Sequence, residues 1–404
     1  MQGQPTRHTM NRRAFCQSAG LALAAIPLAS SIALAQGATP APGGATSRLA
    51  DMLALVPAML PAIENPAMLT MSFADIAAQL ETTGVTPPDS MDDESASMWY
   101  AATRGLAMPM EATQYLNSWR DDYGFDLFQA DQTVSVDLPP MHLSLYRGRF
   151  DHDAIRATLT ANGYREVEVD GYTLLSLRDD FEQDVSSDFV YKLAAMNHAA
   201  FLEDGTIAFS SVKAALVAVL DVANGLAPAM VEQAGISTLV EQAPSDLVSV
   251  ILINGTMLAM DVPASLIDLE PGATPDISAI ATEIAETSEM PPIVMALLGA
   301  TAGGPLVGDD IETPADVPDA RAVAVALFLS PEHASAAAPV IEERLETDLS
   351  DATTRPYREM FPEFEVRAVP SAPLVIIDLA VQPGASTSIL FQMLYARDLG
   401  FLAW

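Results

Sequence analysis

The clearest alternation of hydrophobic and polar residues begins at Thr133. From Thr133 to Leu138 every second residue is aliphatic, which places one face of a strand against a core. Pro139-Pro140 interrupts this run, and a second alternating run continues to Arg147. These features predict a β-hairpin with its turn at the two prolines.

A helix and two further strands are predicted after this hairpin. Asp151 is a suitable N-cap for a helix that ends at Asn162-Gly163. Ile155 and Leu159 are spaced to face inward from this helix. Asp170-Gly171 is a tight-turn signal between two short strands, so the whole segment predicts the order ββαββ.

The same order is predicted a second time near the carboxyl end. Strands at 293–300 and 321–329 precede a helix whose first residues are Ser330-Pro331-Glu332, a cap followed by a first-turn proline and an acid. Strands at 364–368 and 374–381 complete the set. The predicted fold class is α+β, with mixed or antiparallel sheets covered by helices and a duplicated ββαββ arrangement.

The remaining segments extend this pattern. Residues 48–125 are expected to be mostly helical apart from a strand at 69–73, with helices near 74–83, 94–105 and 110–121. A hairpin signal at Asp204-Gly205, a helix at 211–224 and an apolar strand at 247–253 follow. The tail, 388–404, predicts a final helix that docks on the body, because Arg397 and Asp398 interrupt any membrane anchor.

Composition divides the chain into five parts. Residues 1–35 are predicted to be a signal peptide, and 36–47, rich in Gly, Pro and Thr, a flexible linker. An amino-terminal α+β half, 48–260, is predicted to join a carboxyl-terminal half, 291–404. The Pro- and acid-rich segment 261–290 is expected to be a loose connection between them.

The leader resembles a twin-arginine export signal. Arg12-Arg13 precede Phe15, an apolar run extends from Ala19 to Ala35, and Ala33-Leu34-Ala35 is a small-x-small cleavage site. We therefore expect an exported, extracytoplasmic protein, with an uncleaved amino-terminal anchor as the alternative. The sole cysteine, Cys16, lies in this leader, so the chain after cleavage has no disulfide, thiolate metal site or cysteine nucleophile.

The charge balance is strongly acidic. The chain holds 19 basic and 53 acidic residues, and the part after residue 35 keeps 16 of the basic residues and all of the acids. A surface of this charge repels nucleic acid and anionic lipid headgroups. We expect no nucleic-acid partner and no stable membrane insertion after signal cleavage, and a soluble protein with an unknown protein or small-molecule ligand.

Motifs that carry known chemistry are missing from the sequence. Gly-x-Ser-x-Gly, Gly-x4-Gly-Lys and Gly-x-Gly-x-x-Gly do not occur in a suitable context. No catalytic residue, cofactor-binding residue or cofactor is therefore predicted.

No metal site is predicted either. None of the histidines after the leader has another at the spacing that puts two ligands on one helix face; they are His142, His152, His198 and His333. Two acidic clusters leave weak divalent-cation binding open, although neither has the spacing of a calcium loop. They are Asp309, Asp310, Glu312, Asp316 and Asp319 in the loop 302–320, and Asp92, Asp93 and Glu94.

Aromatic and acidic residues adjoin at 119–123, as they do in many sugar-binding sites. Asp121-Asp122-Tyr123 follows Trp119 at short spacing. The same pattern is typical of a helix end with the tryptophan packed inward, and we favour that interpretation. A pair of carboxylates that meets only in space, as in glycosidases, stays open as an alternative.

The segment that begins with Gly148-Arg149-Phe150-Asp151 and ends at Gly163-Tyr164, together with the closing 397–404, resembles exported bacterial proteins of unknown function. This resemblance implies no activity and no catalytic residue. The sequence thus predicts a non-catalytic extracytoplasmic binding or interaction protein. The alternatives are a carboxylate-dependent, glycosidase-like hydrolase and a cation-binding structural protein of the cell envelope.

Overall fold

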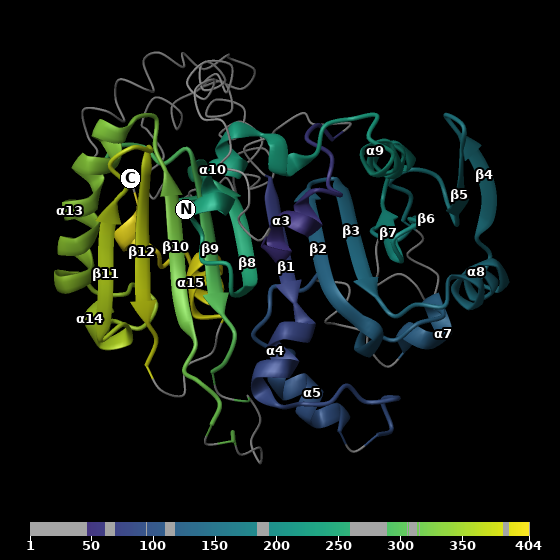
Figure 1. Cartoon of the computed structure of the whole chain (residues 1–404), viewed down its shortest axis with the longest axis horizontal. Helices are drawn as coiled ribbons and strands as arrows, with labels where there is room; N and C mark the ends of the chain where they lie inside the picture. The colour runs from purple at the N-terminus through teal and green to yellow at the C-terminus, as the bar shows by residue number, and fades with distance from the viewer. Residues whose placement is uncertain are drawn as a thin grey trace, which may run out of the picture.

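The computed structural model is built on one twelve-stranded sheet (Figure 1). It describes residues 47–60, 69–93, 95–109, 118–183, 194–258, 289–304, 306, 313, 314, 316–382 and 388–403. Every pair of neighbouring strands is antiparallel, and the order is β11-β12-β10-β9-β8-β1-β2-β3-β7-β6-β5-β4. The fold class is therefore α+β, as predicted.

The strands follow the alternating segments of the sequence closely. Their bounds are β1 Thr70–Asp75, β2 Ala130–Leu138, β3 Met141–Gly148, β4 Arg165–Val169, β5 Tyr172–Ser176, β6 His198–Phe201, β7 Thr206–Ser210, β8 Leu247–Asn254, β9 Met295–Thr301, β10 Arg321–Leu327, β11 Glu363–Ala368 and β12 Leu374–Ala380.

The helices are short apart from one near the carboxyl end. Their bounds are α3 Arg48–Leu53, α4 Ile76–Thr83, α5 Ala96–Thr103, α7 Trp119–Tyr123, α8 His152–Ala161, α9 Lys213–Ala223, α10 Ala234–Gln242, α13 Pro331–Thr347, α14 Tyr357–Met360 and α15 Ile389–Ala396. Single 3-10 turns include η3 Leu127–Gln129, η5 Met230–Glu232 and η7 Gly400–Leu402.

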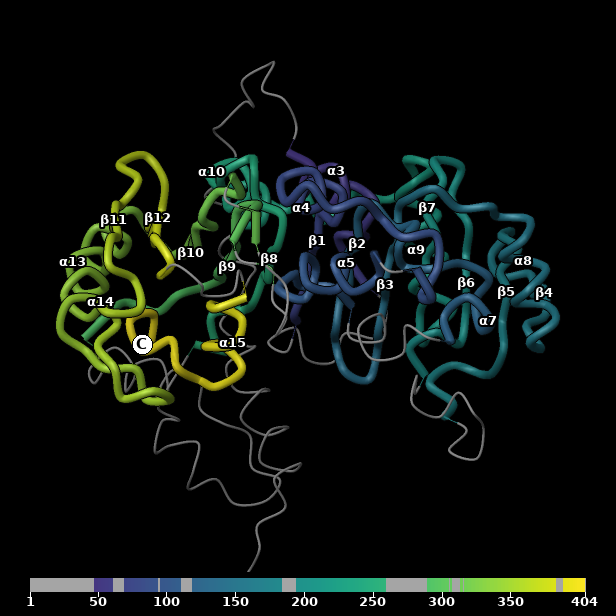
Figure 2. Tube along the Cα trace, turned by 90° about the horizontal axis from the view of Figure 1, so that it is seen from below, coloured from purple at the N-terminus to yellow at the C-terminus, as the bar shows by residue number. Residues whose placement is uncertain are grey.

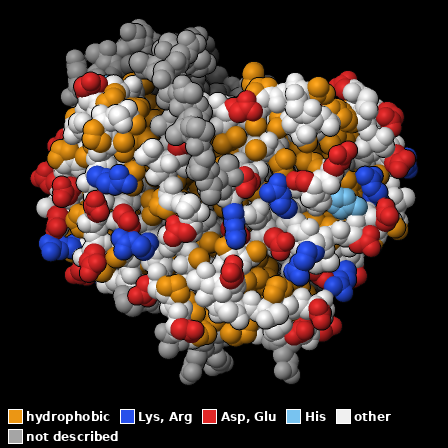
Figure 3. Space-filling view, in the orientation of Figure 1, with side chains coloured by type: hydrophobic (Ala, Val, Ile, Leu, Met, Phe, Trp, Pro, Cys, Tyr) orange, Lys and Arg blue, Asp and Glu red, His pale blue; other side chains and the backbone are white. Residues whose placement is uncertain are grey.

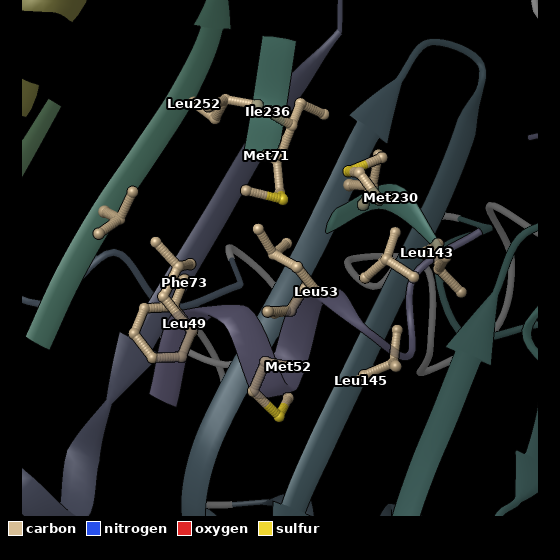
Figure 4. Packing of buried hydrophobic residues seen from close by; sticks show 14 of the residues in the cluster. Leu49, Met52, Leu53, Met71, Phe73, Leu143, Leu145, Met230, Ile236 and Leu252 are labelled. Carbon is tan, nitrogen blue, oxygen red and sulfur yellow. The ribbon is translucent and has the colours of Figure 1, made fainter. Parts of the chain in front are cut away.

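One face of the sheet packs against α3, α9 and α10. Side chains of these helices share a continuous core with alternate residues of the central strands. Figure 4 shows Leu49 and Leu53 of α3 over the sheet, in the same cluster as Phe73 of β1 and Leu143 of β3. Burial of this apolar surface supplies the main driving force for the fold, at about 25 cal/mol per Å².

The opposite face carries two separate cores. Over the β8–β12 side, α13, α14, α15 and η7 form one core, and over the β1–β7 side α4, α5, α7 and α8 form the other. Figure 2, seen from below, shows α14 and α15 well separated from α7 and α8 along the sheet. The sheet is thus covered on both faces.

Local signals placed several elements correctly. Asp151 caps α8, its side chain accepting from the amides of Asp153 and Ala154, and Ser330 caps α13 by accepting from the amide of His333. Pro139-Pro140 forms the turn between β2 and β3. The helix α10 was not predicted, and residues 110–117 of the expected helix 110–121 lie outside the described residues.

The two ββαββ segments pair differently in the sheet. In the second segment β12 pairs directly with β10, whereas in the first β5 is separated from β3 by β6 and β7. The shared chain order therefore does not give a shared arrangement, and the duplication stays a prediction. Both predicted halves contribute strands to the same sheet.

The tail docks on the body as expected. Leu390, Leu394 and Phe401 are buried in the core beneath α13 and α15. Within the described parts of the chain, no helix is long and apolar enough to span a bilayer.

Candidate functional site

A row of polar side chains crosses the ends of β1, β2 and β3. Arg48 donates to both carboxylate oxygens of buried Asp75, at 3.2 and 3.0 Å, and Gln132 donates to Asp75 at 3.4 Å. Arg147 donates to Gln132 Oε1 at 3.4 Å and pairs with Asp204 at 3.0 Å. Because these groups satisfy one another, the row favours a structural role: it fixes the end of β3.

Gly148, the last residue of β3, lets two backbone segments cross closely. A Cβ atom at this position would lie 2.1 Å from the carbonyl oxygen of Gln129 and 2.8 Å from the Cα atom of Ala130. The next amide, of Arg149, donates to Gln129 O at 2.9 Å. This close crossing holds the Arg149 side chain beside η3.

The helix α7 supplies a second arginine. Trp119 and Tyr123 face inward and are buried, with ring centroids 4.9 Å apart, which confirms that Trp119 packs in the core. Arg120 faces outward between them and donates to the backbone oxygen of Asp89 at 3.0 Å. Residues 119–123 are therefore a helix with its tryptophan packed inward, the interpretation favoured from the sequence, and Arg120 and Asp121 are exposed on its outer side.

Arg120 and Arg149 line one recess of about 200 Å³. Phe128 forms an apolar wall, supported by an edge-on contact with Trp99 at 4.8 Å between ring centroids. The recess holds both charged and apolar groups, as small-ligand sites do. Its lining consists of Pro87, Pro88, Asp89, Arg120, Asp126, Phe128, Gln129 and Arg149.

Asp126 is the buried carboxylate of this recess. Its side chain is 7% exposed and contacts the guanidinium of Arg120, whose side chain is 57% exposed. Burial raises the pKa of Asp126, and the nearby Asp121 adds to that effect, whereas the Arg120 charge and hydrogen bond lower it; the net direction is upward.

Arg149 makes weaker contacts within the protein than Arg120 does. Its side chain is 65% exposed, and its Nε atom lies 3.8 Å from Asp131. Its other contact is a 3.5 Å hydrogen bond to the backbone oxygen of Phe128. A long, exposed ion pair of this kind contributes little to stability, so Arg149 is available to a ligand at small cost.

Basic side chains are scarce in this chain. On the face shown in Figure 3, Lys and Arg side chains lie among more numerous Asp and Glu side chains. Only 16 Lys and Arg residues follow residue 35, against 53 acids. The recess is therefore a place where the fold brings scarce cations together.

A second cluster resembles a catalytic triad in its residue types. His198 Nδ1 lies 2.9 Å from Ser176 Oγ, and His198 Nε2 lies 3.0 Å from Asp180 Oδ1, without hydrogen-bonding alignment at the second contact. Lys213 pairs with the same oxygen of Asp180 at 2.9 Å. These four side chains come from β5, the following loop, β6 and α9.

Three observations favour a structural role for this cluster. The His198 side chain is fully buried. Burial and the Lys213 charge lower its folded-state pKa to about 4, although Asp180 acts to raise it. An imidazole of such low basicity is a weak general base near neutral pH. Ser176 Oγ also has a competing acceptor, the backbone oxygen of Arg178 at 3.0 Å. The cluster therefore holds the loop after β5 against α9.

This cluster predicts a pH dependence of stability. Because the His198 pKa falls from its ordinary 6.5 to about 4 on folding, the unfolded chain binds more protons between these values. The free energy of unfolding is expected to drop by up to about 3 kcal/mol as the pH falls through this window. Urea unfolding of the protein and of His198→Gln measures it.

The variant serves as the comparison because it removes the titrating group. The stability difference between the two proteins should change with pH between about 6.5 and 4 and stay constant above that window. A difference that stays constant throughout would show that His198 is not held neutral by the fold.

The other sequence-derived candidates do not gather at the recess. His142 Nδ1 pairs with Asp137 at 2.6 Å across β2 and β3, and His152 contacts the Gly205 backbone oxygen at 3.3 Å. Among the described residues, no three His, Cys, Asp or Glu side chains form a metal-binding group. Asp309, Asp310 and Glu312, and Glu94 of the second cluster, lie outside the described residues.

Sequence reasoning did not identify the recess. Arg149 stands in the Gly148-Arg149-Phe150-Asp151 run, and Arg120 stands beside Trp119, yet neither arginine was assigned a role. The available signal was the scarcity of cations, which makes each arginine informative. Comparison of the chain with protein-family models, with curated proteins and with solved structures gives no match.

Proposed function

We propose that this protein is an exported, non-catalytic binding protein that takes a small ligand into the recess between α7 and the end of β3. The observation that carries this proposal is the convergence of Arg120, Arg149 and the buried Asp126 on one recess with an apolar wall. In this proposal the protein acts outside the cytoplasm after loss of residues 1–35. Its acidic surface disfavours nucleic acid as a partner.

The lining supports binding better than covalent chemistry. Guanidinium groups recognise carboxylates and similar oxyanions through paired hydrogen bonds, and Gln129 adds an amide close by. A recess of about 200 Å³ accommodates a small molecule only. The ligand is therefore expected to be small and polar.

A ligand screen with Arg149→Ala tests the proposal. The chain from Gln36 to Trp404 is screened by thermal melting against small carboxylates, amino acids and sugars. A true ligand stabilises the protein by about 2.7 kcal/mol at a hundred times its Kd. Arg149→Ala should weaken binding at least about tenfold, the loss of one charge-assisted contact, and should leave the free protein's stability nearly unchanged.

The matched control is Arg165→Ala, an exposed arginine on the edge strand β4. It changes the net charge equally but lies away from the recess, so binding should persist. Equal binding by Arg149→Ala and the unaltered protein would place the ligand elsewhere and remove the proposal.

The carboxylate-dependent hydrolase has one observation in its favour. Asp89 and Asp126 line the same recess, and burial raises the pKa of Asp126, as the general acid of a glycosidase requires. Aryl glycosides belong in the same screen for this reason. Aryl release that Asp126→Asn abolishes would replace the binding proposal with a hydrolytic one.

A further inference from the structure

We infer that the recess binds a small anion and that Asp126 competes with this anion for Arg120, so that binding strengthens as the pH falls. The inference rests on the proposed function and specifies the ligand class and the regulation of the same recess. An anion here means a small oxyanion such as a carboxylate or sulfate, which matches the planar donors of two guanidinium groups.

Asp126 occupies the position that an external oxyanion would take on Arg120. Its carboxylate contacts the guanidinium and is nearly buried, whereas Arg120 extends outward into the recess. Arg120 also donates to the backbone oxygen of Asp89, at 3.0 Å. Since a guanidinium has five N–H donors, Arg120 can donate to an external oxyanion when Asp126 no longer occupies those donors.

The charged groups around Asp126 set the affinity of the recess for an anion. Arg120 and Asp121 come from α7, Asp89 from the loop before α5, Asp131 from β2 and Arg149 from the segment after β3. With Asp126 ionised, the two arginines are outnumbered by the acids around them. Protonation of Asp126 removes one competing negative charge and frees Arg120, so the recess becomes more attractive to an anion.

Asp126 is easier to protonate than an exposed aspartate. Its side chain loses most of its hydration on burial, and this raises its pKa above the ordinary value in spite of Arg120. The neutral form therefore grows at a higher pH than for an exposed aspartate. A general loss of negative charge also favours anions at low pH, so the test must separate the local effect from the global one.

Sulfate is the probe, because its double charge does not change over the range used. Calorimetric titration of the chain from Gln36 to Trp404 between about pH 7 and pH 4.5 should show binding that strengthens steadily as the pH falls, with a limit of about tenfold, the effect of one neighbouring charge worth roughly one pKa unit. Asp126→Asn should bind sulfate about tenfold more tightly at pH 7 and lose most of the pH dependence.

Glu365→Gln is the matched control for the global charge. Glu365 is an exposed acid on the edge strand β11, so its replacement should leave both the affinity and its pH dependence nearly unchanged. Should Asp126→Asn fail to fold, Arg120→Gln decides the point, because it should weaken sulfate binding and flatten its pH dependence.

The outcomes separate this inference from the proposed function. If Arg149→Ala abolishes sulfate binding while Asp126→Asn matches the unaltered protein at every pH, the competition is overturned and the recess remains the site. If neither replacement changes binding, the sulfate is an adventitious ion only, and both the inference and the recess as an anion site are overturned.

Discussion

Replacing Gly148 with alanine is expected to lower the free energy of unfolding by about 3 kcal/mol, a large loss for a single methyl group. The new Cβ would lie 2.1 Å from the Gln129 carbonyl oxygen, closer than any real contact. Backbone atoms on both sides must therefore move apart. The hydrogen bond from the Arg149 amide to Gln129, now 2.9 Å, is expected to break.

The same change should also remove ligand binding, because Arg149 and Gln129 line the recess. Urea unfolding measures the stability, and the ligand screen measures the binding. Gly235→Ala, within α10, is the matched control: its Cβ meets only the end of the flexible Leu327 side chain, at 3.2 Å. That control should change stability by at most about 1 kcal/mol in either direction. Equal stability of the two variants would contradict the close crossing.

Replacing Asp398 with alanine is the second change with a large expected effect, about 3 kcal/mol of lost stability. Asp398 is 2% exposed, and its carboxylate accepts hydrogen bonds from Ser350 Oγ and the Asp351 amide, each at 2.6 Å. The Tyr357 hydroxyl lies 3.1 Å from the Asp398 backbone oxygen and accepts from the Gly400 amide at 3.1 Å. Alanine leaves buried donors without an acceptor.

Two companion variants make this expectation specific. Asp398→Asn keeps one acceptor oxygen and should lose less stability than Asp398→Ala. Glu365→Ala removes an exposed acid from β11 and should stay within about 0.5 kcal/mol of the unaltered protein. Thermal and urea unfolding provide the comparison. If Asp398→Ala were as stable as Glu365→Ala, the tail would not depend on this carboxylate.

The hydrogen bonds of buried Asp398 could not be predicted from the sequence. The two charges, Arg397 and Asp398, led to the prediction that the tail docks on the body, and the burial of Leu390 and Phe401 confirms that docking. The partner of the carboxylate, Ser350, lies 48 residues away. No local pattern connects positions so far apart, since the pairing arises when the tail docks against the turn after α13.

The strands were the elements that the sequence predicted best. Period-two alternation placed β2 and β3, and caps at Asp151 and Ser330 placed α8 and α13, because these signals act within a few residues. The helix α10 lacked such a signal: its N-cap position is Gln233, which makes no side-chain cap. The pairing of strands also escaped prediction, because β6 and β7 separate β5 from β3 only through long-range contacts.

The candidate site belongs almost wholly to the tertiary structure. Asp89, Arg120, Asp126 and Arg149 are spread over sixty positions of the sequence and meet because α7, η3 and the end of β3 converge. By itself the sequence determined the α+β class, most strands and the inward face of Trp119, since these depend on local propensity and periodicity. Only the tertiary structure decided the single sheet, the neutral buried His198 and the recess, because burial and charge neighbours exist only once distant segments have packed.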